Sequence, residues 1–162
     1  MEITTFVIAL IGCVGTILTW VFYFWNSRVS VLFEINGYFD AKTDFIVNCS
    51  LTNKSNTPVS ITNVSLRING KSYDVYRFET VILSHEEAHG SQIISREETK
   101  NAAFPINLYP LVGENRYLLF PLDRSDSLPF DTNLTFQIQT NRNRQIRYSI
   151  ELSKVPHLFQ RL

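Results

Sequence analysis

Hydrophobic residues follow two patterns along this chain: they are continuous near the N-terminus and alternate with polar residues after position 28. From Ile3 to Trp25 there are 23 consecutive residues without a charged side chain. A helix rises about 1.5 Å per residue, so this stretch reaches about 34 Å and can cross a hydrocarbon core of about 30 Å. A domain of this size rarely encloses a helix that is apolar on every side. The pattern therefore predicts a transmembrane helix.

The two ends of the apolar stretch carry residues typical of a membrane anchor. It begins at Ile3, and near its other end Trp20, Tyr23 and Trp25 have amphipathic rings that favour the headgroup level. Arg28 follows the stretch. We expect a single-pass anchor in the cell membrane, with the lipid bilayer as its partner. Arg28 favours a cytoplasmic position for the rest of the chain, but one basic residue leaves the side of the membrane open.

Two kinds of processing compete with a retained anchor. A cleaved signal peptide has a basic start, an apolar region of about 7–15 residues and small residues at the cleavage point. This chain begins with Met1-Glu2, has a longer apolar run and shows no Ala-x-Ala after it. Leu10-Ile11-Gly12-Cys13 is similar to a bacterial lipobox, but the apolar run continues well past Cys13. The retained anchor is the favoured interpretation.

The strongest local signal in the rest of the chain is a β-hairpin. Apolar and polar residues alternate over Val59–Ile68, with one change of phase at Thr62-Asn63 that is typical of a β-bulge. Asn69-Gly70 follows, and then Lys71–Tyr76. Asn-Gly between two alternating runs is typical of a two-residue turn, because both central residues need positive φ.

Other segments complete an all-β pattern. A turn is expected at Asn36-Gly37, and the polar stretch Ser84–Ala103 predicts a short helix or a mobile insertion. Seven or eight short strands over about 130 residues indicate an antiparallel, immunoglobulin-like β-sandwich. We expect an anchor at 1–28, the sandwich at 29–155 and a loose C-terminal tail at 156–162. The remaining strands are expected at Val29–Ile35, Phe45–Thr52, Phe78–Leu83, Ile106–Val112, Arg116–Leu122, Asn133–Thr140 and Gln145–Leu152.

Composition narrows the function classes. The chain has 15 Lys+Arg and 15 Asp+Glu, and this balance argues against a nucleic-acid partner, since such proteins carry a basic excess. Two cysteines are too few for a disulfide framework, and 44% hydrophobic residues are too many for disorder. No pattern points to a small-molecule substrate or a cofactor.

One catalytic motif is present. His85, Glu86 and His89 match H-E-x-x-H, in which two imidazoles one helical turn apart bind Zn²⁺ and the glutamate activates a metal-bound water. Ser84 and Glu87 have capping-box spacing, which predicts one or two helical turns here. No third ligand stands at a customary position. We therefore expect no metal site and no catalytic residue, and keep a zinc-dependent hydrolase as the alternative.

A basic cluster surrounds the last predicted turn. Arg142, Arg144 and Arg147 suit contact with a phosphate or a lipid headgroup. A charged turn that keeps a sheet edge soluble is the favoured interpretation.

The layout of anchor, linker and β-sandwich, together with Asn53–Ile61 and Leu66–Lys71, resembles small membrane-anchored proteins of Gram-positive bacteria and their prophages. Some of these are superinfection-exclusion proteins, which stop an incoming phage from delivering its DNA. The resemblance implies a non-enzymatic binding module whose partner is a membrane or phage protein. An assembly subunit of an envelope complex is a further alternative.

Overall fold

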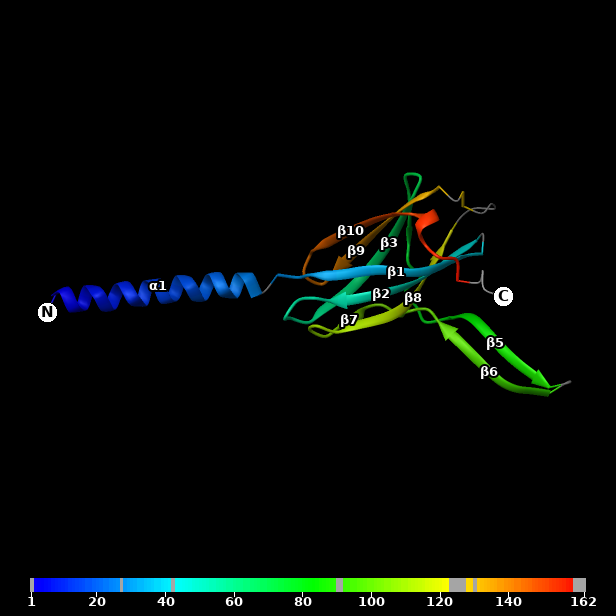
Figure 1. Ribbon diagram of the computed structural model, residues 1–162, viewed down its shortest axis with the longest axis horizontal. Coiled ribbons are helices and arrows are strands. Elements are labelled where there is room, and N and C mark those ends of the chain that lie inside the picture. The colour runs from blue at the N-terminus through cyan, green and yellow to red at the C-terminus, as the bar shows by residue number, and fades with distance from the viewer. Residues whose placement is uncertain are drawn as a thin grey trace.

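The computed structural model describes residues 2–26, 28–41, 43–89, 92–122, 128–129 and 131–158. A single long helix, α1 (Glu2–Asn26), extends away from a body of β-strands (Figure 1). The strands are β1 Val31–Asp40, β2 Asp44–Asn53, β3 Val59–Ile68, β4 Lys71–Asp74, β5 Val81–His89, β6 Gln92–Lys100, β7 Ile106–Leu108, β8 Gly113–Pro121, β9 Asn133–Thr140 and β10 Gln145–Glu151, followed by the 3-10 helix Leu152–Lys154.

Two antiparallel sheets form the body. One has the order β1-β2-β8, and the other has the order β10-β9-β3-β4, with β7 also paired to β3. In immunoglobulin lettering these are strands A-B-E and G-F-C-C′. The predicted fold class, an apolar N-terminal helix followed by an antiparallel β-sandwich, is confirmed.

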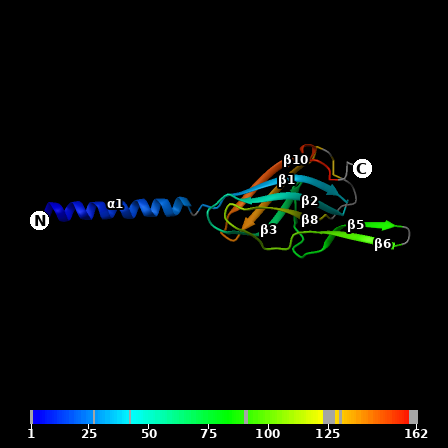
Figure 2. The same ribbon diagram turned by 60° about the horizontal axis from the view of Figure 1, so that its bottom comes forward.

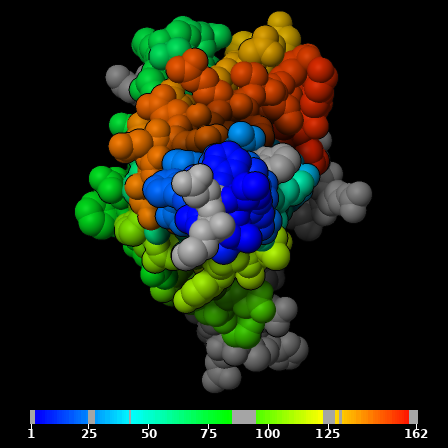
Figure 3. All heavy atoms as spheres, turned by 90° about the vertical axis from the view of Figure 1, so that its left-hand side faces the viewer, coloured from blue at the N-terminus to red at the C-terminus, as the bar shows by residue number. Residues whose placement is uncertain are grey.

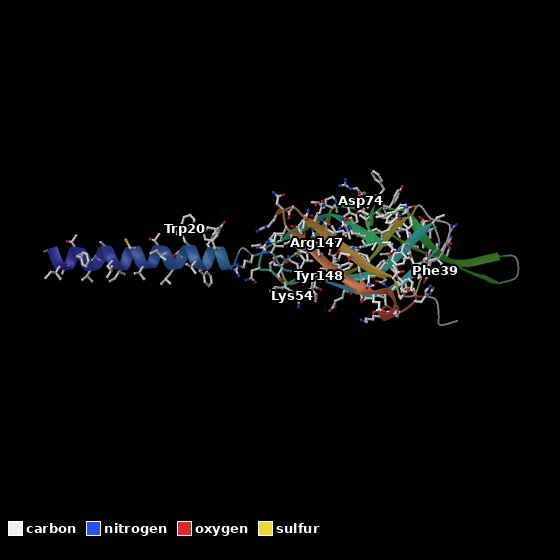
Figure 4. The ribbon with its side chains drawn as sticks, turned by 90° about the horizontal axis from the view of Figure 1, so that it is seen from above. Trp20, Phe39, Lys54, Asp74, Arg147 and Tyr148 are labelled. Atoms are coloured by element: carbon white, nitrogen blue, oxygen red, sulfur yellow. The ribbon has the colours of Figure 1, made fainter. Side chains whose placement is uncertain are left out.

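The core lies between the inner faces of the two sheets. Burial alternates along β9, where Leu134, Phe136 and Ile138 are buried. The ring of Phe136 packs against Phe33 of the facing sheet, with 5.2 Å between ring centroids. The Tyr148 hydroxyl of β10 (Figure 4) donates to the Val31 carbonyl oxygen at 2.6 Å, which ties the edges of the two sheets together.

The predicted hairpin has the expected turn. Asn69 and Gly70 have φ of 48° and 84°, and they join β3 to β4. The pairing of β3 with β9 shifts register between Ile61 and Asn63, where the change of phase predicts a bulge.

The turn predicted at Asn36-Gly37 is wrong. β1 continues through this dipeptide, and its register with β2 shifts between Ile35 and Gly37, as in a β-bulge. A β-carbon at Gly37 would lie 2.6 Å from Leu158 Cδ2 and 3.1 Å from the Pro156 carbonyl oxygen. The glycine therefore permits the close approach of the C-terminal segment.

That segment is not the loose tail expected from the sequence. The Tyr38 amide donates to the Pro156 carbonyl oxygen at 3.0 Å, and the Leu158 amide donates to the Tyr38 carbonyl oxygen at 2.9 Å. The His157 ring stands edge-on to Tyr38 at 5.0 Å. Residues 156–158 thus extend the fold beside β1, and the rest of the predicted tail, 159–162, lies outside the described residues.

Cys49 lies in this core, and its burial makes the stability of the fold depend on pH. Its thiol is buried and donates to the Arg116 carbonyl oxygen at 3.5 Å, and burial raises the pKa of the thiol from 9.0 to about 12. Above about pH 9 the unfolded thiol releases its proton while the folded thiol keeps it. The contribution to stability is therefore complete below pH 9 and is lost as the pH rises toward 12.

We expect Cys49→Ala to remove this part of the loss of stability at alkaline pH. Denaturant unfolding of the detergent-solubilised protein, followed by circular dichroism between pH 8 and about 11, compares the two slopes. The variant should be less stable at pH 8 because it leaves a small cavity, and the difference should shrink as the pH rises. A constant difference across the range would contradict the buried-thiol explanation.

Candidate functional site: the apolar helix and the projecting hairpin

The surface of α1 is apolar and uncovered. The segment Ile3–Phe24 is long and apolar enough to cross a membrane, and no part of its most apolar stretch is buried against the body. The hydroxyls of Thr16 and Thr19 donate to the Gly12 and Gly15 carbonyl oxygens, each at 2.8 Å. The polar side chains in the middle of the helix are thus satisfied internally, as a hydrocarbon environment requires.

The predicted anchor residues lie along this helix and at its exit. Ile3, Trp20 and Tyr23 are exposed, and the rings of Trp20 and Tyr23 lie 5.8 Å and 6.1 Å from that of Phe24. Arg28, just after the helix, is also exposed. Trp25 belongs to α1, but its side chain lies outside the described residues.

Of the two forms expected for Ser84–Ala103, a short helix or a mobile insertion, the helix is wrong for its described residues, 84–89 and 92–103. Most of it belongs to β5 and β6, which pair only with each other in the described part of the chain. Figures 1 and 2 show that this hairpin projects from the body at the end opposite to α1. Its outer edges therefore present unpaired backbone groups.

The H-E-x-x-H hypothesis requires a helix at this position, but the structure has a β-strand here. His85, Glu86 and His89 all lie in β5, with His85 opposite Glu97 and His89 opposite Gln92. Residues four apart share one face of a strand but lie about 13 Å apart, whereas one helical turn brings them within about 6 Å. The side chains of the three motif residues are outside those described. Among the described residues, no three His, Cys, Asp or Glu side chains gather as a metal site.

Asn101 holds the base of the hairpin. The residue is 3% exposed, and its Oδ1 accepts from the Thr80 amide at 2.6 Å. Its Nδ2 donates to the Tyr76 and Phe78 carbonyl oxygens at 3.2 Å and 2.8 Å. One side chain therefore joins the strand entering the hairpin to the strand leaving it. Nothing in the sequence distinguishes this residue from the many other asparagines of the chain, so its role could not be predicted.

The body also holds both ends of the hairpin. The Tyr76 amide donates to the Leu119 carbonyl oxygen and the Ala102 amide to the Tyr117 carbonyl oxygen, each at 2.7 Å. These bonds attach the segments flanking the hairpin to β8.

Apolar side chains are exposed where the hairpin leaves the body. Phe78 is 72% exposed and contacts the ring of the exposed Tyr76, with 6.1 Å between centroids. Val81, the first residue of β5, is exposed as well. We call Tyr76, Phe78 and Val81 the apolar stem. Large apolar side chains exposed together are typical of contact surfaces.

A polar hollow of about 430 Å³ lies at the base of the hairpin. Two ion pairs line it: Lys100 with Glu79 at 3.0 Å, and Arg116 with Glu114 at 2.6 Å. Its two cations are thus already paired with carboxylates, so the hollow offers hydrogen bonding more than free charge.

No protein-family model and no curated protein sequence matches the chain. Among the solved structures that are similar to this chain, two have 18% sequence identity. One is the archaellum periplasmic stator protein complex FlaF and FlaG from Sulfolobus acidocaldarius, with 73% of this chain and 87% of that chain covered and a TM-score of 0.41. The other is the archaellum periplasmic stator protein FlaG from the same organism, with 75% and 100% covered and a TM-score of 0.40.

Proposed function

We propose that this chain is a single-pass membrane protein whose β-sandwich binds another protein through the β5–β6 hairpin, as a non-enzymatic subunit of an envelope assembly. One observation carries the proposal: the hairpin and its apolar stem project from the end of the sandwich opposite to the apolar helix (Figure 1).

The helix determines where the hairpin is presented. With α1 in the bilayer, the sandwich begins at the membrane surface, since β1 starts at Val31, only a few residues after the helix ends at Asn26. The hairpin then points away from the membrane. Anchoring restricts the protein to the membrane plane, which raises its effective concentration toward membrane partners.

The hairpin has features that favour association. An isolated two-stranded hairpin is marginally stable in water, and its open edges can accept a strand of a partner. The apolar stem adds contact area beside these edges. A partner that covers Phe78 and pairs with β5 or β6 would stabilise both.

We expect a photo-crosslinking residue in place of Phe78 to capture one discrete protein partner in native membranes. The matched control is Tyr109, an aromatic residue that is 70% exposed at the other end of the sandwich. Gel electrophoresis and mass spectrometry of the irradiated full-length protein show the adducts. Failure to capture a protein at position 78, or capture of the same proteins at both positions, would refute hairpin-mediated binding.

We also expect Asn101→Ala to weaken partner binding without unfolding the sandwich. The change leaves backbone groups of Tyr76, Phe78 and Thr80 without their side-chain partner, at a local cost of about 1–3 kcal/mol. Hydrogen exchange should accelerate in residues 76–100 and stay slow in β2, β3 and β9, and less partner should co-purify. Asn107→Ala, in the same hollow, is the control. Equal exchange in both variants would rule out the role given to Asn101.

Superinfection exclusion is a narrower form of this proposal and rests on the resemblance alone. It predicts that expression in a sensitive host lowers phage DNA entry while adsorption stays unchanged. Normal phage DNA entry in cells that contain the protein would refute the superinfection-exclusion role and would not affect the proposed role as an envelope subunit.

A further inference from the structure

The strand directions place four separate segments at one end of the sandwich. β1 begins next to the exit of α1, and antiparallel pairing brings the end of β2 and the start of β8 to the same end. The starts of β3 and β10 lie there too, because Ile61 pairs with Thr140 and the β9–β10 turn lines a hollow together with Arg28. We call this the membrane-proximal end, formed by residues 28–30, 54–58, 109–112 and 141–144. Figure 3 looks at this end, with the body surrounding the blue helix.

The membrane-proximal end is basic. Arg28, Lys54, Arg142 and Arg144 are exposed, and its four segments contain no Asp or Glu. In the described part of the chain none of these four side chains forms an ion pair with a carboxylate. Figure 4 shows Lys54 at the end near α1 and Phe39 at the opposite end. Such unpaired cations suit an anionic surface.

Three of the four cations, Arg28, Arg142 and Arg144, line one hollow. It measures about 360 Å³ and is lined by Phe24 at the end of α1, by Arg28 and Val29, and by Arg142 and Arg144 of the β9–β10 turn. A guanidinium group forms paired hydrogen bonds with phosphate oxygens. With α1 in the bilayer, the apolar part of the lining would lie near the region where the acyl chains of a lipid begin. The hollow therefore has the two chemistries of a phospholipid: a phosphate contact above an apolar one.

An apolar loop lies at the same end. Leu111 is 69% exposed and has φ of 59°, a left-handed backbone conformation that is unfavourable for leucine. The loop is held by the Asn53 amide, which donates to the Val112 carbonyl oxygen at 3.0 Å. Tyr109 and Val112 are exposed beside Leu111. The fold thus maintains an unfavourable backbone that displays apolar side chains next to the basic cluster.

We propose that the membrane-proximal end docks on the bilayer, with Leu111 and its neighbours inserted among the headgroups and the four basic side chains bound to phosphates of anionic phospholipids. The inference rests on the proposed membrane anchoring by α1. Juxtamembrane basic residues are attracted to anionic lipid, and apolar insertion adds to that attraction. Docking would fix the tilt of the sandwich and hence the height at which the hairpin is presented.

The test measures the depth of the loop in nanodiscs that contain the full-length protein. A nitroxide label is attached at Val112→Cys, or at Ser72→Cys on β4 as the water-exposed control, in a Cys13→Ala background. The buried thiol of Cys49 stays unlabelled. Electron paramagnetic resonance compares collision with oxygen and with a water-soluble nickel complex in phosphatidylcholine alone and in phosphatidylcholine with phosphatidylglycerol.

We expect the oxygen-to-nickel ratio at position 112 to rise several-fold in the anionic membrane and the ratio at position 72 to stay low in both. Arg142→Gln with Arg144→Gln should abolish the rise. Arg67→Gln with Arg77→Gln removes the same charge from exposed sites outside the membrane-proximal end and should not change it. A ratio that stays low in both membranes, or a rise that survives Arg142→Gln with Arg144→Gln, overturns the proposal.

A label on the native Cys13 distinguishes a failure of membrane docking from a failure of membrane anchoring. If Cys13 is accessible to oxygen and shielded from nickel while position 112 is not, α1 is anchored and docking is refuted. If Cys13 is also accessible to nickel, the anchoring itself fails.

Discussion

The apolar surface of α1 is not covered by the described part of the protein, and the arrangement of the whole chain depends on this constraint. The helix extends beyond the sandwich, its large side chains are exposed, and its internal threonine hydroxyls bond to its own backbone. Under the proposed anchoring, α1 lies in hydrocarbon and the sandwich lies in water. The short connection at residues 28–30 then gives the sandwich a membrane-proximal end and a distal one.

Sequence patterns predicted those parts of the fold in which one face of an element meets the core. In β9 every second side chain is buried, so the alternation is complete, and Asn69-Gly70 adopts the positive φ values that its residue types favour. The apolar run of α1 was equally clear, since length and composition alone define it. In all three cases the information lies within a few neighbouring residues.

Two features that the sequence did not reveal, the role of Gly37 and that of Asn101, depend on contacts with distant parts of the chain. The sequence predicts that Gly37 belongs to a turn, but in the structure its lack of a β-carbon allows Pro156 and Leu158 to pack against β1. β5 and β6 pair only with each other in the described structure, and their sequences show no alternation that would separate a hairpin from a helix or a loop. Asn101 holds the base of the hairpin only because the fold brings the backbone of Tyr76, Phe78 and Thr80 within hydrogen-bonding distance of its side chain.

The two ends of the sandwich differ in charge as well as in position, and this bears on how they act together. The membrane-proximal segments contain only basic charges, whereas the hairpin carries Glu86, Glu87, Glu97 and Glu98 against Arg96 and Lys100. An anionic membrane would therefore attract one end and repel the other, which favours an upright head even before any specific contact. The sheets between the ends are tied together at their edges, as Tyr148 ties β10 to β1. The segments flanking the hairpin are hydrogen-bonded to β8, so a change of tilt at the membrane would also move the hairpin. Lipid composition would then control how far from the membrane a partner meets β5 and β6, without any change in the hairpin itself.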